Sequence, residues 1–167
     1  MQMLQSFGIE VLVDVRRLPG SRKFPQYDQE QMAPALALEA IEYLHLTALG
    51  GKRKPDKASP NTRWRNASFR AYADYMETDF FKEGLDDLQK LARRKTIAYM
   101  CSEAVWWRCH RSLISDALKA KRWQVDHIMG IGKAQPHKYT EPAIVVGNEV
   151  IYREERPLFP ENSSENT

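Results

Sequence analysis

The sequence predicts a single α/β domain: a largely parallel open sheet with flanking helices and a C-terminal hairpin. Three observations support this class. Short apolar segments alternate with amphipathic ones, the 167 residues suit one domain, and no internal repeat divides them. Strands that alternate with helices are typical of βα units, whose strands run parallel. We expect the domain to span 1–155, followed by a polar, disordered tail over 156–167.

The first half of the chain is expected to contain two strands and one helix. The segment IEVLVDVRR (9–17) is apolar through Val15 except for Glu10 and Asp14, which is typical of a buried strand. A helix over 28–42 follows Asp28 as its N-cap. A second strand over 41–49 ends at two glycines, and a loop rich in basic residues and proline covers 50–65.

The second half repeats the alternation. Leucines recur at helical spacing in the segment that predicts helices over 67–77 and 79–94. A third strand over 95–103, a helix over 104–122 and a fourth strand over 124–132 follow. Gly147-Asn148 then predicts the turn of a hairpin.

Polar residues gather where the predicted strands end, and open α/β sheets bind ligands at that edge. Asp14 and the arginines after it leave the first strand, and Cys101 and Glu103 leave the third. We therefore expect an anion-binding crevice there. Its catalytic candidates are Glu103, Cys101, His110 and Asp14, and its substrate-binding candidates are Arg16, Arg17, Arg111 and Tyr72.

Both cysteines lie in the short segment YMCSEAVWWRCHR (99–111). A helix that begins at Ala104 would turn its first N–H groups toward the crevice, where they would bind an anion and favour a Cys101 thiolate. The phosphatase spacing of Cys, five residues and Arg fails, because Arg108 comes one place too late. Cys101 is thus either a nucleophile or a small buried residue, and Cys109 belongs to a packing stripe.

The sequence predicts no metal and no cofactor. Zinc would accept two thiolates and the imidazoles of His110 and His127, but the spacing differs from that of structural zinc sites. On one helix, the adjacent Cys109 and His110 would also point about 100° apart.

Two basic loops, VRRLPGSRKFP and LGGKRKPDKASPNTRWR, favour a phosphate-bearing small molecule or a nucleic acid as partner. The aromatic residues of SFRAYADYM would either stack bases or form a packing face. The net charge of +3 permits an anionic partner without requiring one. No apolar run is long enough for a membrane helix, and two cysteines without a secretion signal predict a cytoplasmic protein.

Several segments together resemble domain-of-unknown-function family 488. They are GIEVLVDVRRLPGSRKFPQYD, IEYLHLTALGG, FRAYADYM, MCSEAVWWRCHRSLISDAL and VDHI, in the family's order over most of 8–128. The resemblance implies a compact α/β domain with no agreed reaction. It places the family's motif at Asp14, Arg16, Arg17, Cys101, Glu103, Cys109, His110 and Arg111.

The resemblance also implies a departure. Members of the family usually begin with a short strand ending in Gly-His-Ser, whereas this sequence begins within the helix that follows it. If that His and Ser belong to the site, we expect a folded but inactive chain with one strand fewer. Three functions stay open: an enzyme on a phosphate-bearing substrate, a non-catalytic nucleic-acid-binding protein, and an interaction module.

Overall fold

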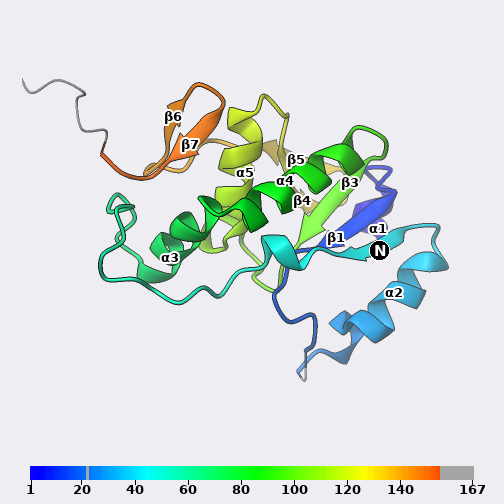
Figure 1. Cartoon of the computed structure of the whole chain (residues 1–167). Helices are drawn as coiled ribbons and strands as arrows, with labels where there is room; N and C mark the ends of the chain where they lie inside the picture. The colour runs from blue at the N-terminus through cyan, green and yellow to red at the C-terminus, as the bar shows by residue number, and fades with distance from the viewer. Residues whose placement is uncertain (22, 155–167) are drawn as a thin grey trace, which may run out of the picture.

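A three-stranded parallel sheet lies at the centre of the computed structural model, which describes residues 1–21 and 23–154 (Figure 1). Its strands are β1 (Val11–Asp14), β2 (Glu42–His45) and β3 (Ile97–Met100), in the order β2-β1-β3. Val11 is in register with both Glu42 and Ile97. The predicted α/β class is confirmed, and the tail predicted over 156–167 lies outside the described residues.

Helices cover both faces of this sheet. The α-helices are α1 (Gln2–Gln5), α2 (Gln29–Ala37), α3 (Ala67–Met76), α4 (Asp79–Ala92) and α5 (Arg111–Ala120). Short 3-10 turns lie at η1 (Pro25–Tyr27), η2 (Thr47–Leu49) and η3 (Trp106–Arg108). None of the helices in the described ranges is long and apolar enough to cross a membrane.

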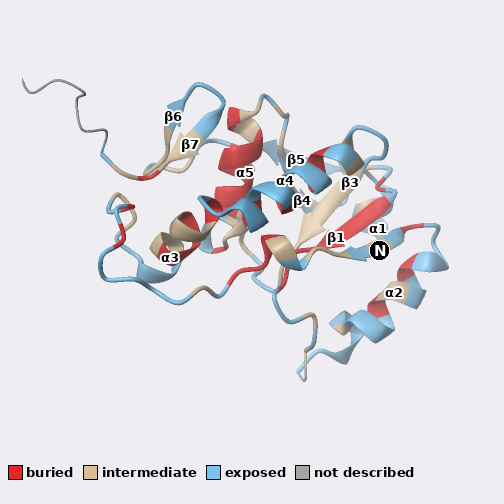
Figure 2. Cartoon of the chain, viewed as in Figure 1, coloured by how far each residue is buried: buried red, intermediate tan, exposed pale blue. Residues whose placement is uncertain are grey.

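Strand β1 is buried on both sides because its side chains alternate between two cores (Figure 2). Val11 and Val13 pack into the larger core with residues of α3, α4 and α5. Leu12 points the other way and packs on Met32 and Leu36 of α2. This alternation decides on which face each polar residue at the end of β1 lies.

The segment predicted as a fourth strand does form one, β4 (Asp126–Gly130), but it lies outside the parallel sheet. It pairs antiparallel with β5 (Lys133–Pro136), because the chain reverses at Gly132, whose φ of 63° favours glycine. The predicted C-terminal hairpin is confirmed as β6 (Ile144–Val146) and β7 (Glu149–Ile151), with Gly147 in its turn.

The prediction of a helix from residue 104 is wrong, since α5 begins at Arg111. Cys109 is extended, with φ −125° and ψ 148°, and only a short 3-10 turn precedes it. The indole of Trp106 stacks on His127 with ring centroids 3.9 Å apart. This tertiary contact holds 104–110 as a loop, so the N–H groups of 104–107 are not the start of a helix.

Candidate functional site

Two thiols and one imidazole meet where β1 and β3 end. The Nδ1 atom of His110 lies 3.5 Å from Sγ of Cys109 and 4.0 Å from Sγ of Cys101. Cys109 is buried, as predicted, while Cys101 and His110 are half-buried, and both cysteines are free thiols. We call these three residues the Cys–His cluster.

The expectation against a metal depended on placing Cys109 and His110 on one helix. That placement is wrong, because Cys109 is extended and His110 is the N-cap of α5, so both side chains turn to one point. The two sulfurs and Nδ1 all lie within 4.8 Å of one another. The cluster therefore presents three ligand-type atoms to a common space.

Backbone contacts fix the orientation of the His110 ring. Its Nε2 lies 3.0 Å from the carbonyl oxygen of Val15, which can only accept, so Nε2 carries a proton and donates it. The ring of Tyr72 packs against the imidazole with centroids 4.9 Å apart. A Cβ on Gly51 would lie 2.8 Å from Nδ1, so only glycine fits at that position. These contacts leave the Nδ1 lone pair directed at the sulfurs.

The pKa values of the two thiols shift in opposite directions. A hydrogen bond from Cys109, aided by His110 and the Glu103 backbone, lowers the pKa of the Cys101 thiol against the opposing effect of burial. The same hydrogen bond, together with burial, raises the pKa of Cys109. The surroundings of the pair therefore favour ionisation of Cys101 over ionisation of Cys109.

Arg111 binds the cluster from the first turn of α5. Its Nε donates to Sγ of Cys109 over 3.4 Å, and its guanidinium also donates to the carbonyl oxygen of Glu103. A cation at the start of a helix opposes the helix dipole. The sulfur and the carbonyl oxygen compensate for that cost. The Glu103 carboxylate itself is exposed at the rim, where it accepts a long hydrogen bond from the Val105 N–H.

Asp14 and Arg16 lie apart from this cluster. They alternate with Val13 and Val15, which pack into the larger core, and so they face the α2 side. Their side chains form a buried ion pair with an N–O distance of 2.5 Å, and Tyr43 donates to the same carboxylate. A carboxylate in an otherwise apolar strand needs a partner, and Arg16 supplies it.

Burial of this pair changes the chemistry of its members. Burial opposes the charge on Arg16, but the hydrogen bonds to Asp14 prevail and raise the pKa of the guanidinium. Burial and the bond to Asp14 likewise raise the pKa of Tyr43. The pair is thus saturated by its own contacts, with Arg16 also donating to the carbonyl oxygen of Pro19.

Arg17, in contrast, lies on the side of the Cys–His cluster and is exposed. Its NH1 donates to the carbonyl oxygen of Lys52 over 2.7 Å. A Cβ on Gly50 would lie 3.1 Å from the Arg17 Cα, so the loop packs closely on the arginine backbone. The two basic loops predicted from the sequence therefore meet beside His110.

Tyr72, predicted to bind substrate, is buried and donates to the carbonyl oxygen of Leu49 over 2.7 Å. It lies in the core behind His110. Two groups that orient the imidazole were not predicted, namely Gly51 and the carbonyl of Val15. A Gly-Gly pair directly after a strand was the available signal, because it marks a close backbone approach.

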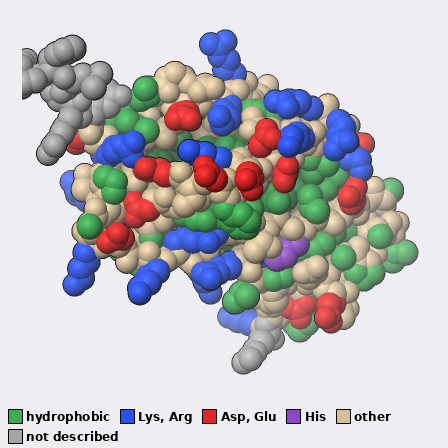
Figure 3. Space-filling model, in the orientation of Figure 1, with side chains coloured by type: hydrophobic (Ala, Val, Ile, Leu, Met, Phe, Trp, Pro, Cys, Tyr) green, Lys and Arg blue, Asp and Glu red, His purple; other side chains and the backbone are tan. Residues whose placement is uncertain are grey.

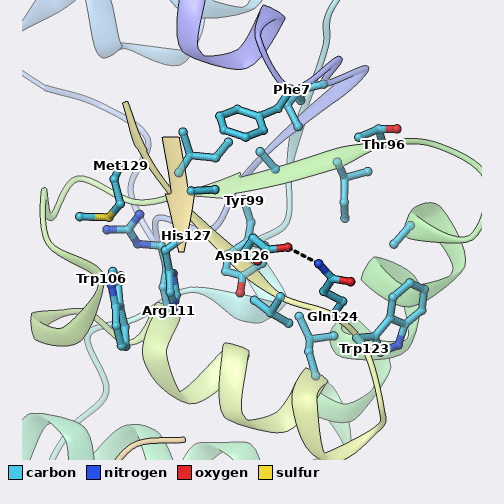
Figure 4. A pocket seen from close by; sticks show the side chains of 18 of the residues that line it. Phe7, Thr96, Tyr99, Trp106, Arg111, Trp123, Gln124, Asp126, His127 and Met129 are labelled. Carbon is cyan, nitrogen blue, oxygen red and sulfur yellow. Dashed lines mark hydrogen bonds between the residues drawn. The ribbon is translucent and has the colours of Figure 1, made fainter. Parts of the chain in front are cut away.

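A second polar network, which the sequence analysis also overlooked, is buried beside β4. His127 and His137 are joined by a 2.9 Å contact between Nε2 and Nδ1, and His137 Nε2 lies 2.9 Å from Asp116. With Trp106 and Arg111, His127 lines a cavity of about 400 Å³ between β3 and β4 (Figure 4). Arg111 thus contacts both the cavity and the Cys–His cluster.

We expect His127 to make the fold sensitive to acid. Burial, followed by the charges of His137 and Arg111, lowers its pKa from 6.5 to about 4. Between these values the unfolded chain binds a proton that the folded chain does not. The free energy of unfolding should therefore fall as the pH drops from 6.5 to 4, by about 3 kcal/mol from this group.

Urea unfolding of the wild type and His127→Gln across this pH range measures that contribution. The glutamine can still donate to His137 but does not titrate, so its acid-dependent loss should be smaller by the stated amount. Gln135→Ala, at an exposed and non-titrating residue opposite His127 on β5, is the matched control and should keep the wild-type slope. Equal slopes for wild type and His127→Gln would refute the assignment.

A known protein family matches the part of the chain that contains most of this site. The model described as "Domain of unknown function DUF488" matches residues 1–118, from α1 into α5. The chain belongs to DUF488. No curated protein and no solved structure matches it. The DUF488 match contains the Cys–His cluster, Arg17, the Asp14–Arg16 pair and Asp116, whereas β4, His127 and His137 follow it. Since the family description names no reaction, function has to be argued from the site.

Proposed function

We propose that this DUF488 chain is an enzyme that acts on a phosphate-bearing substrate at the carboxyl edge of β1 and β3. The observation that carries the proposal is the meeting of reactive and basic groups there. Cys101, Cys109 and His110 form one cluster, and the loop of Gly50 and Gly51 joins that cluster to Arg17.

The basic groups supply the anion-binding part. Arg17 uses one N–H for the Lys52 carbonyl oxygen, and its remaining donors face outward. Lys52 and Lys54, both exposed, follow closely in the chain, while the guanidinium of Arg53 between them is engaged with the Gly50 carbonyl oxygen and the Tyr75 ring. In Figure 3, Lys and Arg side chains also gather along the lower edge of the molecule, near α3 and the segment before it. Such a concentration of donors beside two glycines suits a phosphate group.

The remaining candidates divide into acting and positioning groups. His110 and Cys101 form the reacting centre, with Glu103 at the rim as the acid or base. Arg111 holds Cys109 and borders the cavity, which has room for the organic part of a substrate. Tyr72 acts as a positioning residue for the His110 ring, whereas Asp14 and Arg16 stabilise the fold on the α2 side, because their charges are buried in contact with each other.

A non-catalytic nucleic-acid-binding protein is the second candidate, favoured by the basic loop at 52–65. The aromatic residues weaken it. Trp64 stacks on Phe69 with centroids 4.6 Å apart, and both pack against the larger core. Rings engaged in this way are not available to stack bases.

Titration of the protein with inorganic phosphate, followed by NMR of the backbone amides, tests the proposal. We expect shifts at Gly51, Lys52 and His110. Arg17→Ala should weaken phosphate binding about tenfold, since a charge-assisted hydrogen bond contributes about 1.5–3 kcal/mol. Arg94→Ala is the matched control: it also removes an exposed arginine, but just before β3, at the opposite edge of the sheet.

Turnover of p-nitrophenyl phosphate and its bis ester provides the catalytic readout. His110→Ala and Cys101→Ser should lose turnover at an unchanged melting temperature. Phosphate shifts that persist in Arg17→Ala, or turnover that survives both cluster variants, would contradict the proposal. Tight binding of single-stranded DNA with no ester turnover would favour the second candidate.

A further inference from the structure

The distances within the Cys–His cluster are those of a metal site. Tetrahedral zinc binds sulfur at about 2.3 Å and nitrogen at about 2.0–2.1 Å, which places neighbouring S and N ligands about 3.5 Å apart. Nδ1 of His110 lies 3.5 Å from Cys109 Sγ and 4.0 Å from Cys101 Sγ. A movement of about half an ångström at Cys101 would make the two S–N distances equal, and the two sulfurs lie within 4.8 Å of each other.

The imidazole is prepared in the way that metal-ligating histidines are. Such a ring usually donates its other N–H to a carboxylate or backbone carbonyl, which fixes the tautomer and the direction of the free lone pair. His110 donates from Nε2 to the Val15 carbonyl oxygen over 3.0 Å, and Tyr72 supports the ring from behind. Its Nδ1 is thereby held as an acceptor toward the two sulfurs.

Arg111 stabilises the sulfur ligand Cys109. Arg111 donates from Nε to Cys109 Sγ over 3.4 Å, which compensates the negative charge of a thiolate ligand. This contact also gives a physical reason for an arginine in the first turn of α5. Two thiolates and one imidazole are soft to borderline ligands, a set that suits Zn²⁺ and does not suit Mg²⁺ or Ca²⁺.

The cluster is accessible from the side of Cys101, which is only half-buried and is followed by the exposed Ser102 and Glu103. Gly51 lies over the face of the His110 ring, where a Cβ would be 2.8 Å from Nδ1, 3.1 Å from Cε1 and 3.2 Å from Cγ, so glycine lets the loop pack on the ring without displacing it from the sulfurs. The basic loop begins at Lys52, the residue after Gly51. Three protein ligands with one open position are characteristic of catalytic rather than structural zinc.

We propose that Cys101, Cys109 and His110 form a Cys₂His site for Zn²⁺ whose fourth position opens toward Arg17 and Lys52. The site holds the ion at the reacting centre, where the open position accepts water or a phosphate oxygen. The reaction class it implies, metal-assisted hydrolysis, rests on the proposed function. The metal site itself does not depend on turnover.

Titration of the chelator-treated full chain with Co²⁺, in a thiol-free reducing buffer, tests the site. We expect one equivalent to bind with the intense visible bands of tetrahedral cobalt and a thiolate-to-cobalt charge-transfer band, both abolished by Zn²⁺. The chain has two cysteines, both in the cluster, so the charge-transfer band reports on this site alone.

Cys101→Ser, Cys109→Ser and His110→Ala should each lower the affinity by at least about a hundredfold, the upper limit for loss of an outer-shell partner. Gly51→Ala removes no ligand but places a Cβ on Nδ1, and it should also weaken binding. Ser68→Ala, at an exposed residue of α3 away from the cluster, is the control and should bind as the wild type does. Circular dichroism of each variant confirms its folding.

A cobalt spectrum without the thiolate band, or unchanged affinity in folded Cys101→Ser, would overturn the site. The phosphate titration tests the proposed function independently of the metal site. Loss of phosphate binding with an intact cobalt spectrum removes the proposed function alone, and the reverse outcome removes the metal alone.

Discussion

Replacement of Asp116 with alanine is expected to lower the free energy of unfolding by about 4 kcal/mol, because it breaks a fully buried charged network. The Asp116 side chain is inaccessible to solvent and has hydrogen bonds with His137, Tyr152 and both the N–H and hydroxyl groups of Thr140. Alanine leaves these donors without an acceptor, and an unsatisfied buried donor costs about 1–3 kcal/mol. Urea unfolding at pH 7 measures the loss.

Asp126→Ala is the matched control for this variant. Asp126 is exposed on β4, where its carboxylate accepts from Gln124 over 2.9 Å. Its removal should change stability by less than about 0.5 kcal/mol, as surface substitutions usually do. A loss below about 1.5 kcal/mol in Asp116→Ala would show that water replaces the carboxylate, and the network would then not anchor β7 and the segment after β5.

Local periodicity was sufficient to predict most of the strands and helices. It failed where a distant partner decides the local structure. Nothing near residue 106 reveals that Trp106 will stack on His127, twenty-one positions later, and so keep 104–110 out of a helix. The pairing of β4 is similar: a strand was predictable, but its antiparallel partner β5 was missed.

The site was predicted by region rather than by arrangement. The rule that polar residues meet at strand ends located Cys101, His110 and Arg17 correctly in one area. It also placed Asp14 and Arg16 there, although strict alternation from Val13 and Val15 assigns them to the opposite face. The helix predicted at Cys109 also directed its sulfur away from His110, whereas the extended backbone turns the two side chains to one point. The Asp116–His137 contact spans 21 residues and left no local pattern.

Asp14→Ala is expected to cost about 4 kcal/mol as well, for a different reason. It leaves the guanidinium of Arg16, only 4% exposed, without its counter-charge, and breaking one half of a buried ion pair typically costs about 3–5 kcal/mol. Arg16→Met alone likewise leaves the buried carboxylate of Asp14 without its counter-charge. The double variant Asp14→Ala with Arg16→Met removes both charges and should be clearly more stable than Asp14→Ala alone.

A double-mutant cycle by urea unfolding measures this coupling. Tyr43→Phe is the smaller companion change: it deletes one donor to Asp14, 2.6 Å from the carboxylate, and should cost about 1 kcal/mol. Additive losses from Asp14→Ala and Arg16→Met would mean that the two groups do not stabilise the fold as a pair.

The same double variant separates a structural role of the pair from a direct role in chemistry. Because Asp14 and Arg16 face α2 while the Cys–His cluster faces α5, a folded double variant should keep wild-type phosphate shifts and the cobalt spectrum. If Asp14 were catalytic and Arg16 bound substrate, as their position after a strand first predicted, phosphate binding would fall while the cobalt spectrum persisted. Loss of both signals in a folded protein would instead mean that the pair sets the position of Val15, whose carbonyl oxygen accepts the proton of His110.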